Sequence, residues 1–189
     1  MTVDIYAPIA PAFLDKNLIA DQTWTNLLLK FGVGTGFDAA KGLGQANAVT
    51  VTVMGPGGFN RQRITATMQF PAPTAAGAEF LGVMLHCVQL DTTSNYYFVC
   101  LFQGTARIVT VINGVFTTVA NTPFAVAQGQ SFTITADIIK SLITAKFDAG
   151  GAPATVNISA TDANLTRGFT AFSSISSAIW VSAFKSEQI

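Results

Sequence analysis

The sequence predicts an all-β protein built as an antiparallel two-sheet sandwich, and three observations support this fold class. From Ala48 onward, apolar and polar residues alternate with a period of two, which is typical of half-buried strands. Turn signals recur at short intervals, and Asn113-Gly114 is the strongest. Two hairpin registers bring apolar residues face to face. We therefore expect about ten to twelve short strands and almost no helix.

Residues 1–45 are predicted to form an irregular N-terminal arm or entry segment, and residues 46–189 the sandwich. The first segment contains Pro8, Pro11 and five glycines between residues 32 and 44. These residues disfavour regular structure. An extended arm lying on the sandwich or on a neighbouring subunit fits this composition, and so does an ordinary long entry loop.

Two strands are predicted at the start of the sandwich. Three valines alternate with threonines over residues 49–53, and Gly55-Pro56-Gly57-Gly58 then predicts a turn. Residues 63–70 resume the alternation until Pro71, which cannot donate a hydrogen bond to a sheet.

The residue pairs of a hairpin that turns at Lys140-Ser141 test whether this segment has one apolar and one polar face, as a sandwich requires. Its apolar pairs are Ile134 with Phe147, Ala136 with Ala145 and Ile138 with Ile143. Its polar pairs are Thr135 with Lys146 and Asp137 with Thr144. This hairpin is therefore expected to cover a core with one face and to meet solvent with the other.

The Asn113-Gly114 turn predicts a second hairpin, because a type I′ turn needs positive φ at both central residues. Its pairs are Ile112 with Val115, Thr110 with Thr117, Ile108 with Val119, Val111 with Phe116 and Val109 with Thr118. Both faces are partly apolar, so we expect this hairpin inside the sandwich or at a subunit contact.

The amino-acid composition limits the kinds of partner that we expect for this protein. The chain is 50% hydrophobic, but it contains no apolar run near the roughly 18 residues of a membrane helix, so membrane insertion is not expected. Charged residues make up 11% and the formal net charge is zero, which favours a homo-oligomer over a nucleic-acid-binding protein. The alternative is a surface hydrated by uncharged Thr, Ser, Asn and Gln.

Cys87 and Cys100 are the two cysteines, and a turn at Thr93-Ser94 would place them opposite one another on adjacent strands. A disulfide and a pair of reduced buried thiols both remain open. Residues 1–6 lack the basic and apolar pattern of a secretory signal, so the reduced pair is favoured.

No catalytic constellation is found, so an enzyme is not expected. His86 is the only histidine, and it stands in an apolar strand without an evident orienting carboxylate. The acidic residues are too scattered for a glycosidase pair. Asp91 and Asn95 flank a loop but fall short of a calcium site, so neither a cofactor nor a metal is expected.

Tyr96 and Tyr97 must face opposite sides of their sheet, which leaves one of them available for an exposed surface. An exposed Tyr beside amide side chains suits both a sugar and a neighbouring subunit. The candidate glycan or partner contacts are Tyr96, Tyr97, Asp91, Asn95, Gln103 and Arg107.

The order of several motifs resembles concanavalin A-like lectin and laminin G-like jelly-roll domains over roughly residues 48–185. The motifs are Gly82-Val83-Met84-Leu85, Asn95-Tyr96-Tyr97-Phe98-Val99, Gly104-Thr105-Ala106-Arg107-Ile108, the Asn-Gly hairpin, residues 128–134 and Arg167-Gly168-Phe169. The resemblance implies an antiparallel jelly roll whose concave face binds glycans in many relatives. Cys100 stands where the family would place an arginine, and the hydrolase carboxylate motif of the family is missing.

Such domains also occur in phage virions. The leading hypothesis is a bacteriophage virion structural protein, a capsid decoration or a tail or fibre component, located in the virion and assembled in the host cytoplasm. Its partners would be further copies of the chain, other virion proteins and a cell-surface glycan. The alternative is an extracellular carbohydrate-binding module or adhesin.

Overall fold

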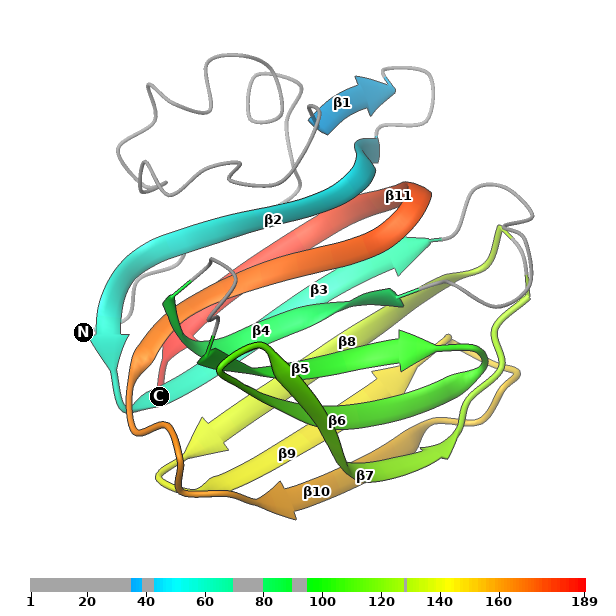
Figure 1. Ribbon diagram of the computed structural model, residues 1–189. Helices are drawn as coiled ribbons and strands as arrows, with labels where there is room; N and C mark the ends of the chain where they lie inside the picture. Colours follow the sequence, from blue (N-terminus) through cyan, green and yellow to red (C-terminus); the bar gives the residue numbers. More distant parts are fainter. Residues whose placement is uncertain (1–34, 39–42, 70–79, 90–94, 128) are drawn as a thin grey trace.

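The structure is a computed structural model of the 189-residue chain and describes residues 35–38, 43–69, 80–89, 95–127 and 129–189 (Figure 1). Eleven strands and no helix lie in these residues, which confirms the predicted all-β class. None of the described residues belongs to a helix that could cross a membrane. The strands are β1 (Thr35–Asp38), β2 (Leu43–Phe59), β3 (Arg61–Gln69), β4 (Phe80–Gln89), β5 (Asn95–Phe102), β6 (Thr105–Ile112), β7 (Val115–Pro123), β8 (Ser131–Ile139), β9 (Leu142–Asp148), β10 (Val156–Thr161) and β11 (Gly168–Gln188).

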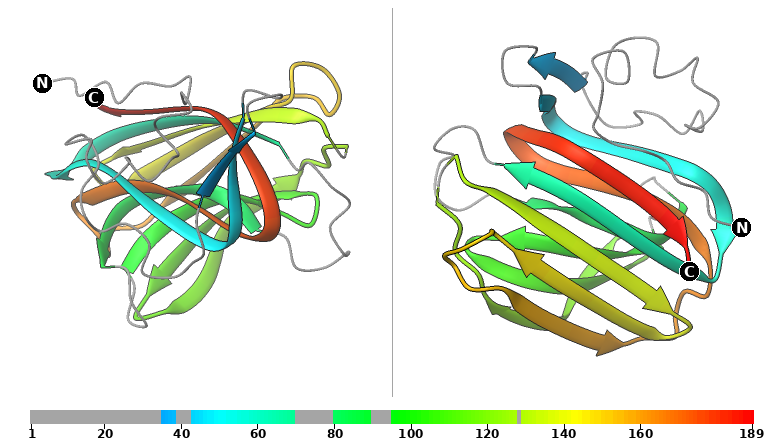
Figure 2. Two further views of the ribbon diagram at one scale, coloured as in Figure 1. Left: turned by 90° about the horizontal axis from the view of Figure 1, so that it is seen from above. Right: turned by 180° about the vertical axis from the view of Figure 1, so that it is seen from behind.

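The strands form two antiparallel sheets that pack face to face. The first sheet runs in the order β10, β9, β8, β3 and ends on residues 180–188 of β11. The second sheet begins on residues 169–175 of β11 and continues through β4, β5 and β6 to β7. Because β11 bends back between the sheets, both belong to one hydrogen-bonded network (Figures 1 and 2). β2 pairs with β11, and β1 pairs with β2.

The main core lies between the two sheets. Strands β3 and β8 alternate strictly between buried and partly exposed residues, so the first sheet buries one face only. Large side chains that fill the core include Tyr97, Phe124, Phe132 and Phe147. Burying apolar side chains at the density of a protein interior is the dominant favourable term for such a sandwich.

Strands β5 and β6 differ from the first sheet because they are buried on both faces. A second apolar cluster covers the face that points away from the main core, and its members are Met84, Cys87, Tyr96, Phe98, Cys100, Val109 and Val111. The edge strand β7 is mostly exposed. The prediction that the β6–β7 hairpin is apolar on both faces therefore describes β6 better than β7.

Both predicted hairpin turns are present. The β8–β9 register around Lys140-Ser141 matches every predicted pair. In the β6–β7 hairpin, Asn113 and Gly114 have φ values of 51° and 75°, as a type I′ turn requires. One predicted pair is wrong, because a bulge shifts the register and Ile108 faces Ala120 instead of Val119.

One expectation at the start of the sandwich needs correction. Gly55-Pro56-Gly57-Gly58 lies inside β2, and the turn to β3 comes at Asn60. The pairing of β2 with β11 is irregular at this point, so the glycines and the proline are accommodated within a strand. Among the described residues, strand pairing is present from Thr35 onward, and the division at residue 46 stays a prediction; residues 1–34 lie outside the described residues.

Candidate functional site

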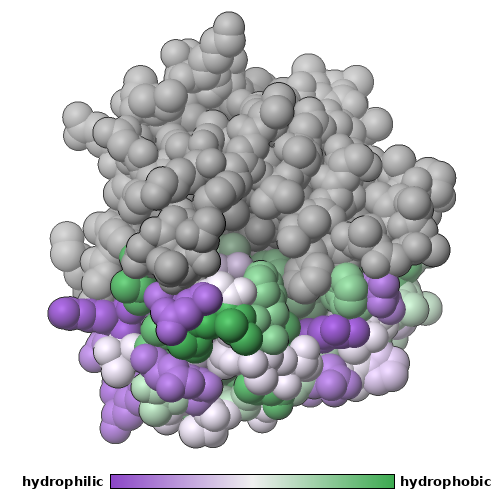
Figure 3. All heavy atoms as spheres, viewed as in Figure 1, coloured by the Kyte–Doolittle hydropathy of each residue, from purple (hydrophilic) through white to green (hydrophobic). Residues whose placement is uncertain are grey.

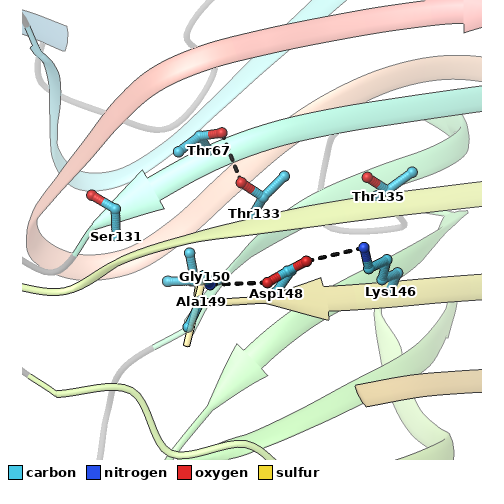
Figure 4. A pocket seen from close by; sticks show the side chains of 9 residues that line it. Thr67, Ser131, Thr133, Thr135, Lys146, Asp148, Ala149 and Gly150 are labelled. Carbon is cyan, nitrogen blue, oxygen red and sulfur yellow. Dashed lines mark hydrogen bonds and ion pairs between the residues drawn. The ribbon is translucent and has the colours of Figure 1, made fainter. Parts of the chain in front are cut away.

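The outer face of the first sheet carries a hollow of about 420 Å³ over the ends of β3, β8 and β9 (Figure 4). The alternation of these strands sends their apolar residues into the core and their hydroxyl and charged residues outward. The residues that line the hollow are Thr67, Ser131, Phe132, Thr133, Thr135, Lys146, Asp148, Ala149 and Gly150.

Hydrogen bonds fix the polar groups of this hollow. The hydroxyls of Thr67 and Thr133 lie 2.9 Å apart across the β3–β8 pair. Lys146 Nζ lies 3.0 Å from Asp148 Oδ2, and the Gly150 N–H donates to Asp148 Oδ1 at 2.9 Å. The Gly150 N–H and Lys146 lower the pKa of Asp148, so this carboxylate is ionised at neutral pH.

A second hollow of about 340 Å³ adjoins the first and extends across β8, β9 and β10. Thr135 and Lys146 line both hollows, and Asp137, Thr144, Asn157 and Ser159 continue the polar lining. The guanidinium of Arg63 donates to both carboxylate oxygens of Asp137, at 2.7 Å and 2.6 Å. We call the two hollows together the hydroxyl groove.

The hydroxyl groove can bind a polyhydroxylated molecule. Its threonine and serine hydroxyls both donate and accept, its carboxylates accept, and Lys146 donates, which matches the alternating hydroxyls of a sugar. Phe132 is the only aromatic residue among the side chains that line the groove, and it is 1% exposed. Recognition by the described lining would therefore rest on hydrogen bonds.

Tyr96 and Tyr97 face opposite sides of the second sheet, as predicted, but neither is an exposed platform. Tyr97 is fully buried in the main core, and Tyr96 is 7% exposed in the second apolar cluster. Burial raises the pKa of both phenols, which stay protonated. Phe98 and Phe116 pack edge-on against Tyr96. The expected stacking surface is therefore absent at this pair.

The other predicted contact residues do not form one site. The Asn95 side chain accepts a hydrogen bond from the Asn113 N–H at 2.9 Å, which ties it to a turn. Gln103 is exposed in the β5–β6 turn. The Arg107 guanidinium carbon lies 4.5 Å from the centre of the Phe102 ring. Asp91 lies outside the described residues.

Cys87 and Cys100 are not joined in a disulfide, and both are buried in the second apolar cluster. The predicted register between them is wrong, because Gly82 faces Cys100 and Cys87 pairs with Phe169 of β11. An irregularity between Leu85 and Gln89 shifts the β4–β5 pairing. Burial raises the pKa of the Cys100 thiol, so this group is not a thiolate at neutral pH.

His86 lies at the irregularity in β4 and is buried beside Tyr97, with the ring centres 6.0 Å apart. Its Nδ1 lies 3.1 Å from the Leu165 carbonyl oxygen. Burial lowers the pKa of His86, while the bond to Leu165 opposes that shift. The imidazole therefore serves as a structural donor. The described residues contain no group of three His, Cys, Asp or Glu side chains that could hold a metal ion.

The hydroxyl groove was missed at the level of sequence, although its signal was present. The predicted β8–β9 register already paired Thr135 with Lys146 and Asp137 with Thr144. Those pairs were interpreted as an ordinary solvent-facing surface. Their neighbours in the groove come from β3 and β10, and local pattern does not reveal which strands lie next to this hairpin.

Comparison with solved structures places the fold among lectin-like jelly rolls. A carbohydrate-binding module, CBM66 from Bacillus subtilis, has a TM-score of 0.63 and 13% identity, covering 82% of this chain and 92% of that one. The winged bean acidic lectin in complex with methyl-α-D-galactose has a TM-score of 0.63 and 6% identity, covering 81% and 89%. The jelly-roll sandwich predicted from sequence is thereby confirmed.

A xylan β-1,4-xylosidase from Bacillus halodurans is similar over part of its length, with a TM-score of 0.55 and 9% identity. The match covers 77% of this chain but 33% of the enzyme, so this chain spans about one third of that protein. No protein-family model and no curated protein sequence matches the chain. These comparisons support the jelly-roll fold and give no indication of a virion protein.

Proposed function

We propose that this chain is a carbohydrate-binding module that holds a glycan in the hydroxyl groove. The observation that carries this proposal is the groove itself, in which two adjoining hollows share Thr135 and Lys146 and follow the first sheet across β8 and β9. Its length and its hydroxyl-rich lining suit several consecutive sugar units of a chain. The lectin-like fold supports the same conclusion.

Binding to a glycan array followed by calorimetric titration tests this proposal. Thr135→Val should weaken binding of the selected glycan about two- to tenfold, because one hydroxyl that serves both halves of the groove is lost. Valine suits a strand, so the fold should remain intact. Thr118→Val makes the same change at an exposed position of β7, outside the groove, and should leave affinity unchanged. Absence of saturable binding to any glycan would refute the proposal.

Assembly of the module into a homo-oligomer is a second candidate role, favoured by the exposed apolar residues of β7. Val115, Phe116 and Val119 are 65%, 51% and 39% exposed on this edge strand. Figure 3 shows apolar surface among hydrophilic residues on the described part of the front face. An edge strand with such residues offers a surface for a second copy of the chain. Native mass measurement should then show an oligomer that Phe116→Ser dissociates, and a monomeric wild type would exclude it.

A further inference from the structure

A separate hollow of about 550 Å³ lies at the end of the first sheet, where three connections meet. These are the β2–β3 turn at Asn60, the β8–β9 turn at Lys140-Ser141 and the crossover from β10 to β11, all at the lower left of Figure 1. The crossover contributes Ala163, Leu165, Thr166 and Arg167. We call this the basic hollow.

The wall of the basic hollow is held in place by buried groups. The Asp162 N–H donates to the Ser141 carbonyl at 2.8 Å, which joins the crossover to the β8–β9 turn. The Leu165 N–H donates to the Tyr97 hydroxyl at 2.8 Å, and the Leu165 carbonyl accepts from His86 Nδ1 at 3.1 Å. A site whose wall is fixed before binding loses less entropy when a ligand arrives.

Positive charge collects at this hollow. Lys140 and Arg167 line the hollow, and both side chains are exposed. Arg61 is the first residue of β3, directly after Asn60, and it pairs with Ile139, the residue before Lys140. None of these three cations makes an ion pair with a described carboxylate. The formal net charge of the whole chain is zero, so this concentration is local.

The acidic residue of the crossover, Asp162, makes no ion pair with these cations. Asp162 Oδ1 accepts from the Tyr97 hydroxyl at 2.8 Å and from the Asn164 N–H at 2.8 Å. Asp162 Oδ2 accepts from Asn164 Nδ2 at 3.0 Å. Both carboxylate oxygens are thus engaged inside the loop, which leaves Lys140 and Arg167 to meet an anion from outside.

The backbone at Lys140 has the positive φ that also occurs at Gln103 and Asn113, the first residues of two other hairpin turns. Its φ of 59° lies in the left-handed region, which costs a residue with a Cβ about 1 kcal/mol relative to glycine. Glycine or asparagine would suit this turn better, yet a lysine stands there and lines the hollow. The turn geometry accounts for this φ, and the contribution of Lys140 to the hollow is its charge.

We propose that the basic hollow binds the anionic group of an acidic sugar, a uronate or a sulfated residue, in a chain that continues into the hydroxyl groove. This inference rests on the proposed function. The two hollows of the groove follow β8 from Ser131 to Asp137, and the basic hollow begins beyond the strand, at Lys140. The exposed pair Ile139 and Leu142 lies between them, so a glycan that runs along β8 passes over this apolar pair before it meets the cations.

The groups present suit such an anion. The guanidinium of Arg167 can bind two oxygens of a carboxylate or a sulfate together, and Lys140 adds a second charged donor. The Asn60 amide and the Ser141 and Thr166 hydroxyls can meet the ring hydroxyls of the same sugar.

Calorimetric titration with paired oligosaccharides tests this inference on the full chain. One pair is a galacturonate hexamer and its fully methyl-esterified form, and the other is a sulfated galactan oligomer and its desulfated form. We expect at least one acidic member to bind about tenfold more tightly than its neutral partner. The preference should shrink as salt rises from low to physiological concentration, because the cations are exposed.

Substitutions at Lys140 and Arg167 test whether the preference for acidic oligosaccharides arises from the basic hollow. The double variant Lys140→Gln and Arg167→Gln should abolish this preference, so that the acidic and neutral members bind with equal affinity. The charge-conserving variant Lys140→Arg and Arg167→Lys should retain most of it. Lys140→Gly relieves the left-handed strain, so it should keep or raise the melting temperature while it weakens binding of the acidic oligomer.

The outcomes separate this inference from the proposed function. Equal affinity for acidic and neutral members, with sensitivity to Thr135→Val, would overturn the inference and leave the groove proposal standing. A preference that survives the double glutamine variant would also overturn it. Binding of none of the four oligosaccharides would overturn the inference, and the glycan array would then decide the groove separately.

Discussion

The outer faces of the two sheets differ, although both sheets belong to one network and share one core. On the first sheet, threonines, Lys146 and the acidic residues Asp137 and Asp148 face outward and line a groove. On the second sheet, Met84, Phe98 and Cys100 also point away from the core, yet each is at most 2% exposed. The first sheet thus has one buried face, whereas strands β5 and β6 of the second sheet are buried on both faces.

This difference explains how a chain with 11% charged residues distributes its polarity. Strict alternation in β3, β8 and β9 produces a polar surface of hydroxyl and charged residues. The apolar excess of the sequence is concentrated in β5 and β6, whose near-continuous burial resembles that of strands covered on both sides. We therefore expect ligand binding on the outer face of the first sheet, whereas buried side chains of both sheets contribute to the stability of the fold.

The largest effect expected from this comparison comes from Phe98→Ala. Removing a buried aromatic ring from the outer face of the second sheet should lower the free energy of unfolding by about 3–5 kcal/mol, because apolar burial is lost and a cavity remains. Urea denaturation followed by circular dichroism measures the change.

Thr144→Ala is the matched change on the outer face of the first sheet, where the residue is exposed and lines the hydroxyl groove. It should alter the free energy of unfolding by no more than about 0.5 kcal/mol. Similar losses in Phe98→Ala and Thr144→Ala would show that the two outer faces do not differ in their contribution to stability.

The parts of the fold that sequence predicts well are those set by local rules. The Lys140-Ser141 hairpin was predicted pair by pair, since a two-residue turn and one apolar face together leave a single register. The β4–β5 register was not, because the chain bulges near His86, where φ is 48°. Neither composition nor alternation reveals such a bulge, and one extra residue changes every later pair.

The candidate site shows the same limit. The polar face of the β8–β9 hairpin could be read from sequence, but its closure into a groove needs β3 and β10, which are placed by long-range pairing. The basic hollow needs three separate connections to meet. Tyr97 was expected among contact residues and instead supports the crossover from inside, a role fixed by Asp162 and Leu165 far along the chain.

Tyr96 and Tyr97 lie on opposite faces of the second sheet, so replacing each by Phe compares the two faces with the same chemical change. Tyr97→Phe removes a hydroxyl that donates to Asp162 and accepts from the Leu165 N–H, so a carboxylate oxygen and a backbone N–H each lose a partner. The free energy of unfolding should fall by about 1–3 kcal/mol. Tyr96→Phe acts on the other face, where no hydrogen bond joins the hydroxyl to the described residues, and should cost about 0.5 kcal/mol or less.

Urea midpoints of the two variants measure the difference. Equal midpoints would mean that the Tyr97 hydroxyl does not hold the crossover, and the fixed wall of the basic hollow would then need another source.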